Sequence, residues 1–197
     1  MVGIAAGIPA PHDPANHVRL GDVVVSSGQG VVQYDLTKRH PDSTLEVRSI
    51  LPPPSTLLLG AVRGLEVGRL SGRRPWEAYI AGASGIAVRP SDEDDKLFVV
   101  RVNKRLCWKQ IPHPPDSNRI PQQPRIHYGL IGSGNCLLKD IQERDRLAKA
   151  LGIRAVEMEG AGVADAAWNQ TEVSHYLVLK YVNTVTYLLL GSDANVD

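Results

Sequence analysis

The stretch RAVEMEGAG, Arg154 to Gly162, decides the fold, because it changes character within nine residues. It begins as an apolar strand, and then two carboxylates flank Met158 before a run of small residues. A buried charge without a partner is costly, so acids at the end of a strand meet water, a basic group or a polar ligand. Carboxylates can hold two neighbouring hydroxyls, such as a ribose diol. From these residues alone, a solvated turn and a ligand site both stay open.

A strand and a helix precede this stretch. The segment RIHYGLIGSGN, residues 125–135, alternates like a strand and ends in small residues. A helix is predicted over 140–151, with Asp140 as its cap. Strand, helix and strand in this order are typical of a βαβ unit, in which ligands bind at the carboxyl ends of the strands. Ser133-Gly134-Asn135 and Met158-Glu159 are therefore expected near one crevice.

The beginning of the chain predicts a small-residue turn followed by two strands. Gly3 to Gly7 are read as a tight turn whose backbone N–H groups could cradle an anion. Residues 18–25 and 31–34 are read as two strands joined by a short turn at Gly28-Gln29-Gly30. We expect strands near 22–26, 127–132 and 154–158 to be neighbours, and Gly3 to Gly7, Ser133 and Glu159 to line one cleft.

The middle of the chain predicts one helix and a long irregular insertion. Apolar residues at helical spacing indicate a helix over roughly 56–67, with Ser55 as N-cap and Gly68 as its end. Residues 69–125 have mostly loop composition, apart from a short edge strand over Leu97 to Val102. The acidic cluster at 92–95 is read as a solvated loop, since it lacks calcium-loop spacing. His12, His17 and His113 lie in Pro-rich loops and are read as exposed.

Length and composition fit one globular domain over residues 1–197. The chain is 43% hydrophobic and 22% charged, with a formal net charge of +1, which indicates neither a nucleic-acid nor a membrane partner. Cys107 and Cys136 lie far apart and show no metal spacing, so no metal site and no oxidising compartment are indicated. No apolar run reaches the roughly 20 residues of a transmembrane helix. We expect a cytoplasmic protein.

The segment VEMEGAG resembles the ribose-binding signature of the nucleoside phosphorylase superfamily, which includes purine nucleoside phosphorylases and methylthioadenosine/S-adenosylhomocysteine nucleosidases. The resemblance implies that Glu159 holds the ribose 2′- and 3′-hydroxyls, that Met158 packs against sugar and base, and that Glu157 lies close to the sugar. VRLGDVVVS at 18–26 and GVVQYD at 30–35 are similar to a fungal branch that is often fused to NACHT or ankyrin-repeat modules.

The resemblance implies two further groups of substrate-binding residues. Gly3, Ile4 and Ala5 match the glycine-rich turn at the ribose and anion end of the site, and Ser133, Gly134 and Asn135 match the base side. Phosphate-using relatives carry Ser or Thr where this chain has Ile4, which cannot donate a hydrogen bond. Relatives also carry several strands before this turn, with a water-activating Glu or phosphate-holding basic residues. The resemblance therefore implies a domain that lacks its N-terminal strands.

The catalytic acid of the family has two alternative alignments in this chain. The family places an Asp, which protonates or hydrogen-bonds purine N7, after the strand that follows the signature. Aligning the strand at 177–182 puts Asn183 or Thr184 there, and neither is a carboxylic acid. Aligning the strand at 187–190 puts Ser192-Asp193 there. Asp193 is the catalytic candidate, and loss of the acid is the alternative.

Together these observations predict an α/β protein, a three-layer α/β/α sandwich with a mixed central sheet. The function that the resemblance implies is N-glycosidic cleavage of purine nucleosides or related nucleotides, without a cofactor but with phosphate as an optional co-substrate. A homo-oligomer is an accompanying expectation. The alternative is a non-catalytic nucleoside-binding or signalling-associated module that keeps the fold.

Overall fold

The computed structural model describes residues 1–42, 44–48, 51–83, 91, 93–102, 106–121, 123–169, 175–185 and 188–190. The helices are α1 (Thr56–Leu70), α2 (Trp76–Gly82), α3 (Ile141–Leu151) and α4 (Gly160–Trp168). The strands are β1 (Val2–Gly7), β2 (Val23–Gln33), β3 (Thr37–Arg39), β4 (Leu45–Val47), β5 (Leu97–Val102), β6 (Leu106–Ile111), β7 (Ile126–Ser133), β8 (Ile153–Glu157), β9 (Leu179–Val185) and β10 (Leu188–Leu190).

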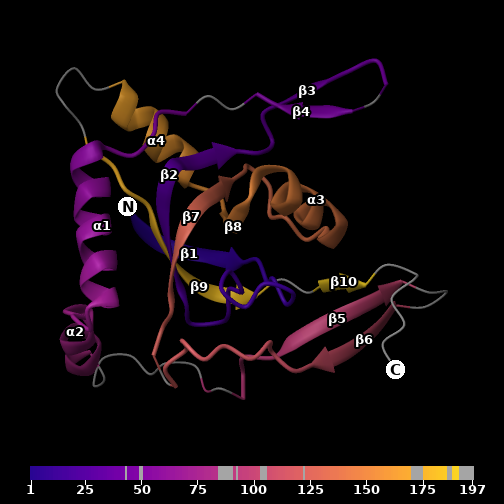
Figure 1. Ribbon diagram of the computed structural model, residues 1–197. Helices are drawn as coiled ribbons and strands as arrows, with labels where there is room; N and C mark the ends of the chain where they lie inside the picture. The colour runs from indigo at the N-terminus through magenta and orange to yellow at the C-terminus, as the bar shows by residue number, and fades with distance from the viewer. Residues whose placement is uncertain are drawn as a thin grey trace.

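Five strands form a mixed sheet that closes on itself in the order β1-β8-β7-β2-β9 (Figure 1). β7 pairs in parallel with both β2 and β8, so the three strands expected to be neighbours are confirmed as such. The α/β class and the mixed sheet are also confirmed. The three-layer sandwich is not, because β1 pairs with β8 on one side and with β9 on the other, which closes the ring. Local patterns cannot reveal this pairing, since β1 and β9 lie at opposite ends of the chain.

The expected pair of strands around Gly28 is one bent strand, β2, and the prediction of a turn was wrong. Ser26 pairs with Gly129 and Val31 with Ile131, so five steps along β2 match two along β7. Gly28 and Gly30 have φ values of 59° and 82°, which glycine adopts without strain. They place a bulge between two halves that run in the same direction, whereas a turn would reverse the strand.

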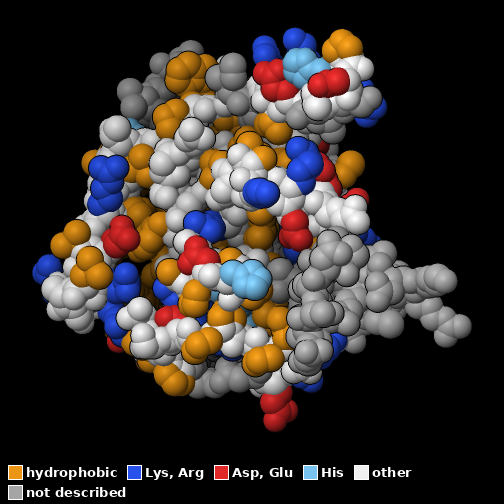
Figure 2. Space-filling model, turned by 45° about the vertical axis from the view of Figure 1, so that its right-hand side comes forward, with side chains coloured by type: hydrophobic (Ala, Val, Ile, Leu, Met, Phe, Trp, Pro, Cys, Tyr) orange, Lys and Arg blue, Asp and Glu red, His pale blue; other side chains and the backbone are white. Residues whose placement is uncertain are grey.

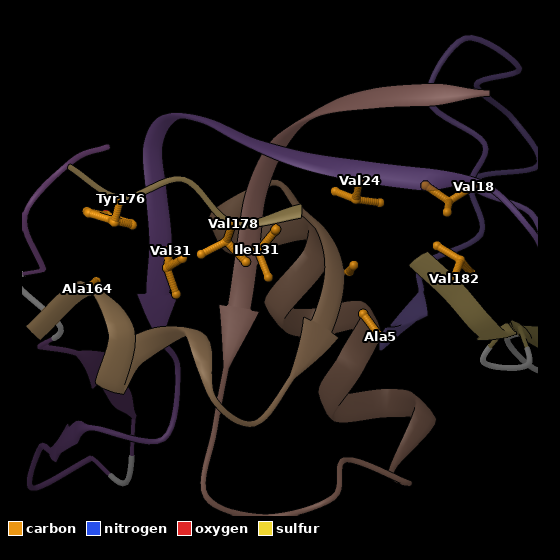
Figure 3. Close-up of a cluster of buried hydrophobic side chains, with 10 residues drawn as sticks. Ala5, Val18, Val24, Val31, Ile131, Ala164, Tyr176, Val178 and Val182 are labelled. Atoms are coloured by element: carbon orange, nitrogen blue, oxygen red, sulfur yellow. The ribbon is translucent and has the colours of Figure 1, made fainter. Parts of the chain in front are cut away.

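The core fills the interior of the ring and the space beneath α4 (Figure 3). Its members come from all five strands of the ring and from α4, and they include Ala5, Val24, Val31, Ile131, Ala155, Ala164 and Val182. A second cluster lies where α3 packs on β8, around Leu147 and Ile153. β-branched residues dominate because their stiff side chains pack well on a pleated surface. The strands that carry the candidate site are therefore held by buried apolar contacts.

The helix boundaries follow the predicted capping residues closely. The Ser55 hydroxyl accepts a bond of 3.3 Å from the Leu58 amide, and Asp140 accepts from the amides of Gln142 and Glu143. Gly152 ends α3 in the left-handed conformation, with φ 71°. α1 continues to Leu70, past the predicted end, because a glycine inside a helix lowers stability without forcing a stop.

The insertion at 69–125 contains ordered structure that sequence reasoning read mostly as loop. It supplies α2 and the β5–β6 hairpin, which β10 extends in parallel. Within the insertion, the strand at 97–102 was predicted, but the prediction that it is an edge strand was wrong, because β5 lies between β10 and β6. Figure 1 shows the hairpin projecting to one side of the ring, while α1 and α2 lie along the other.

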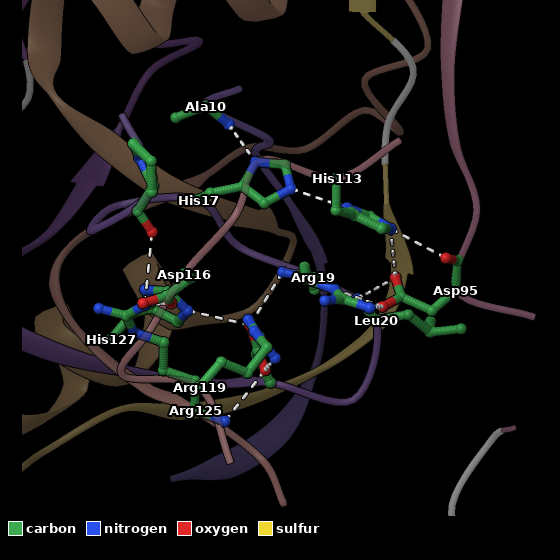
Figure 4. Close-up of polar contacts among 12 residues, drawn as sticks. Ala10, His17, Arg19, Leu20, Asp95, His113, Asp116, Arg119, Arg125 and His127 are labelled. Carbon is green, nitrogen blue, oxygen red and sulfur yellow. Dashed lines mark hydrogen bonds and ion pairs between the residues drawn. The ribbon is translucent and has the colours of Figure 1, made fainter. Parts of the chain in front are cut away.

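Two histidines and one aspartate join this insertion to the ring (Figure 4). His17 Nε2 lies 2.9 Å from His113 Nδ1, and Arg19 pairs with Asp95 at 2.5 Å. His17 and Asp95 are buried, so the prediction that they are solvated was wrong; His113 is largely covered too. Burial lowers the pKa of His17 to about 4. These contacts have no local signal in the sequence, because His17 and His113 are 96 residues apart and Arg19 and Asp95 are 76 residues apart.

The surface carries both signs of charge. Figure 2 shows acidic, basic and histidine side chains gathered over the β3–β4 hairpin at the top of the view. His40 and Arg48 both pair with Glu46 there. In the part of the chain that the structure describes, no helix combines the length and apolar character needed to cross a bilayer.

Candidate functional site

A cleft of about 270 Å³ opens at the carboxyl end of β8. Its wall is formed by β1, by the end of β8 with the turn after it, and by the segment that follows β7. The lining residues are Ile4, Ala5, Ala6, Tyr34, Cys136, Leu137, Leu138, Val156, Glu157, Met158, Glu159 and Asn183. The volume is near the lower end of the range of about 300–1,000 Å³ that is typical of small-molecule sites. Three of the predicted substrate-binding residues, Glu157 to Glu159, lie together at its rim.

Glu157 is buried and fully committed to protein partners. Its carboxylate accepts bonds from the Gly160 amide at 2.9 and 3.0 Å and from the Glu159 amide at 3.1 Å. These amides stand at the N-terminus of α4, where the helix dipole favours a negative charge. Its Oε2 also lies 2.6 Å from the ammonium of Lys180. Glu157 therefore supports the turn and has little capacity left for a ligand.

Glu159 has the opposite environment. Its side chain is 61% exposed at the cleft, and its Oε2 lies 3.1 Å from Lys180 Nζ. Within the described residues Oε1 has no hydrogen-bond partner. Because a carboxylate offers about four acceptor positions, Glu159 can bind two hydroxyls while it keeps the contact with Lys180. Beside it, Met158 is 45% exposed and offers an apolar surface to the same cleft.

Lys180 joins the two glutamates, and sequence reasoning missed it. It lies on β9, its side chain is fully buried, and it pairs with both carboxylates. The group of two carboxylates and one ammonium carries a formal charge of −1, which suits a ligand that develops positive charge. The signal was present in the sequence: Lys180 is the lone charged residue in the apolar run LVLKYV, and such a lysine requires a buried acid.

Ser133, Gly134 and Asn135 do not line the cleft but build its base. The Ser133 hydroxyl accepts a bond of 3.1 Å from the Ala161 amide at the start of α4. Asn135 is exposed, and both its backbone and its side-chain nitrogen bond to Asp35. Gly134 packs under the ring of Tyr34, where an added Cβ would lie 2.4 Å from a ring carbon. Tyr34, which was not predicted, lines the cleft in their place.

The predicted turn at Gly3 to Gly7 is the strand β1, so the reading as an anion cradle was wrong. Val2 to Gly7 pair with β9, and Ala6 and Gly7 also pair with β8, so the segment is extended backbone and does not form the turn that a cradle would need. Ile4 and Ala5 line the cleft nonetheless. An added Cβ at Gly3 would lie 3.0 Å from Lys180 Nζ, so the small residue leaves room for the ammonium.

Of the positions weighed for a catalytic acid, Asn183 has a described side chain, and it lines the cleft. It is exposed at the end of β9, next to Val182. Asp193 lies outside the described residues. Among the residues that line the cleft, Glu157 and Glu159 are the carboxylic acids, and both contact Lys180. The described residues hold no group of three or more His, Cys, Asp or Glu placed to bind a metal ion.

Comparison with known proteins identifies solved structures with a similar fold and a longer relative that is similar in sequence. No family model matches the chain. A nucleotide-binding leucine-rich repeat-like protein from the fungus Hyaloscypha variabilis is 36% identical over 172 residues, which is 83% of this chain and 17% of that protein. The chain thus spans about a sixth of the length of the curated relative it matches.

Solved nucleosidases share the architecture. The 5′-methylthioadenosine/S-adenosylhomocysteine nucleosidase of Campylobacter jejuni aligns with a TM-score of 0.50 at 16% identity, over 100% of this chain and 58% of that one. A Borrelia burgdorferi protein, provisionally assigned to the same activity and bound to adenine, aligns with a TM-score of 0.50 at 16% identity, over 92% and 53%. A Helicobacter pylori futalosine hydrolase mutant reaches 0.49 at 17% identity, over 92% and 54%. The two alignments with a TM-score of 0.50 show that the chain has a nucleosidase-like fold.

Proposed function

We propose that the chain is a nucleosidase-like domain of the nucleoside phosphorylase superfamily that binds purine ribonucleosides in this cleft and cleaves their N-glycosidic bond. The observation that carries the proposal is Glu159, an exposed carboxylate at the rim of an otherwise largely apolar cleft, held on one side by the buried Lys180. Its free oxygen is placed to accept the ribose hydroxyls. The sharing of a fold with a protein that carries adenine supports a purine as the base.

The charges of the cleft suit this reaction. Cleavage of the N-glycosidic bond passes through an oxocarbenium-like transition state, so the sugar becomes positive as the bond breaks. The net formal charge of −1 on Glu157, Lys180 and Glu159 stabilises that developing charge, because it is fixed before the reaction begins. The leaving base also needs a proton, and Asp193 is the proposed donor. Water or phosphate completes the reaction.

A second candidate function, nucleoside binding without cleavage, is favoured by Asn183. Asn183 lines the cleft at a position weighed for the acid, and its amide side chain cannot protonate a leaving base. The long relative, whose name describes a nucleotide-binding leucine-rich repeat-like protein, fits a role as a sensor module in a larger, cytoplasmic protein. Both functions require the same ribose contact.

Two measurements test the proposal. Calorimetry should show wild-type binding of adenosine, inosine or guanosine, and Glu159→Ala should weaken it by roughly ten- to a hundredfold, because charge-assisted hydrogen bonds contribute about 1.5–3 kcal/mol each. The 2′-deoxynucleosides should lose less, since one hydroxyl is absent. Glu93→Ala, which removes an exposed carboxylate elsewhere, should bind like wild type. Equal losses for ribo- and deoxyribonucleosides would refute diol recognition.

Chromatography of the same incubations separates the two functions. Release of free purine indicates cleavage, and ribose or ribose 1-phosphate as the second product distinguishes water from phosphate as nucleophile. Asp193→Asn should abolish release and retain binding if Asp193 is the acid. Binding without release by the wild type would establish the second function instead. Absence of binding by the wild type would overturn both.

A further inference from the structure

A second cavity, of about 260 Å³, opens at the other end of β7. Ile126 to Tyr128, at the start of β7, line this cavity, whereas residues that follow Ser133, at the end of β7, line the nucleoside cleft. Seven residue steps of about 3.3 Å place the two openings about 23 Å apart along the strand. The end of α1 and the start of α2 form one wall of the cavity, and residues 118–120 and 123–125 form the other. The cavity is thus independent of the proposed nucleoside site.

The walls of this cavity are rich in arginine. The charged side chains that line it are Arg69, Arg74, Arg119, Arg125 and Glu66. Three of the arginines pair with acids outside the lining: Arg74 pairs with Glu77 at 3.3 Å, and Figure 4 shows the pairs of Arg119 and Arg125. Arg119 makes two bonds to Asp22, of 2.7 and 2.9 Å, and Arg125 pairs with Asp116. These arginines are held rigidly, so the wall is ordered before any ligand arrives.

Arg69 differs from these three, because one of its N–H donors is unsatisfied. It lies in the last turn of α1, and its Nε atom is buried without a hydrogen-bond partner among the described residues. A buried N–H without an acceptor is destabilising, so an acceptor supplied from the cavity would be bound favourably. Tyr128 contributes a hydroxyl to the same cavity. Burial, together with the neighbouring charge of Glu66, raises the pKa of Tyr128, so this hydroxyl stays protonated and can donate as well.

We propose that this cavity binds a small oxyanion, a phosphate or a carboxylate group, with Arg69 as the residue that holds it. An oxyanion presents several acceptors at once and matches the planar guanidinium better than it matches a lysine ammonium. Trp76 and Ile120 offer apolar surface for the remainder of a small metabolite. Glu66 lies in the same wall and selects a ligand that also carries a hydrogen-bond donor, such as a hydroxyl.

The test is calorimetric titration with inorganic phosphate and, separately, with succinate, which distinguishes the two kinds of oxyanion. Arg69→Gln should weaken binding of the preferred anion at least about tenfold. Arg69→Lys keeps the charge but loses the Nε–H, and it should weaken binding by a smaller factor. Arg63→Gln, an exposed position on the same helix, should leave the affinity unchanged.

Three outcomes would overturn the proposal. The first is no saturable binding of either anion by the wild type up to about 10 mM. The second is equal affinity in wild type and Arg69→Gln, which would place any bound anion elsewhere, including the nucleoside cleft. The third is an equal loss in Arg63→Gln, which would indicate a general effect of charge. If Arg69→Gln melts early, Arg69→Lys decides, because it preserves the charge on α1.

Discussion

Replacing Lys180 by methionine tests whether the buried ammonium supports the fold of the candidate site. The variant keeps the length and apolar stem of the side chain but removes the charge that lies 2.6 Å from Glu157 and 3.1 Å from Glu159. Glu159 is exposed and can be solvated. Glu157, whose side chain is 1% exposed, would keep its bonds to backbone amides but lose its countercharge.

The expected loss is large compared with the stability of a domain. Removing one partner of a buried ion pair costs about 3–5 kcal/mol, out of a typical total of about 5–15 kcal/mol. For a chain of this size, about 2–4 °C per kcal/mol corresponds to a drop in Tm of roughly 6–20 °C. Urea unfolding should show a lower midpoint with an unchanged slope, because the surface exposed on unfolding is the same.

Two further variants make this measurement decisive. Lys139→Met, at an exposed position, should melt within about 2 °C of wild type. Combining Lys180→Met with Glu157→Gln removes the uncompensated charge and should recover more than half of the lost stability. A single variant Lys180→Met that unfolds like wild type would refute the reasoning. So would a double variant no more stable than the single one, because the loss would then come from packing alone.

Two other predictions concern the base of the cleft and the buried acid of the ring. Gly134→Ala should destabilise the fold by about 1–3 kcal/mol, because the added Cβ would meet the ring of Tyr34. Gly162→Ala in α4 should stabilise the fold by up to about 1 kcal/mol, because the added Cβ would have no atom within 4 Å. Equal melting temperatures for the two variants would contradict this prediction. Burial opposes ionisation of Asp22, but the hydrogen bonds from His127 and Arg119 outweigh burial and lower the pKa of Asp22. The ionised Asp22 therefore contributes its full stabilisation of the fold above about pH 4, and this stabilisation is lost as the pH falls further. Urea midpoints measured between pH 2 and 6 should fall steeply in wild type and less in Asp22→Asn.

The parts of the fold that sequence predicts well are those whose causes are local. The capped helix α3 and the strands on either side of it follow from periodicity, an Asp cap and a terminal glycine, all within about 30 residues. The closing of the ring has no such local cause. β1 pairs with β9 across the whole chain, and the register is set by which residues are buried on both strands. A short apolar strand and a small-residue turn look alike until their partner strand is known.

The same contrast between local and distant causes explains what could be predicted of the candidate site. The signature around Met158 places two carboxylates at the end of β8, and the structure shows that they are not equivalent. Glu157 serves the turn and Glu159 faces the cleft, because β9 brings Lys180 against the buried one and leaves the other at the rim. Neither the distance from β8 to β9 nor the side chain that arrives there can be inferred from the signature. The placement of the two carboxylates thus depends on Lys180, which lies 21 residues beyond Glu159 in the chain.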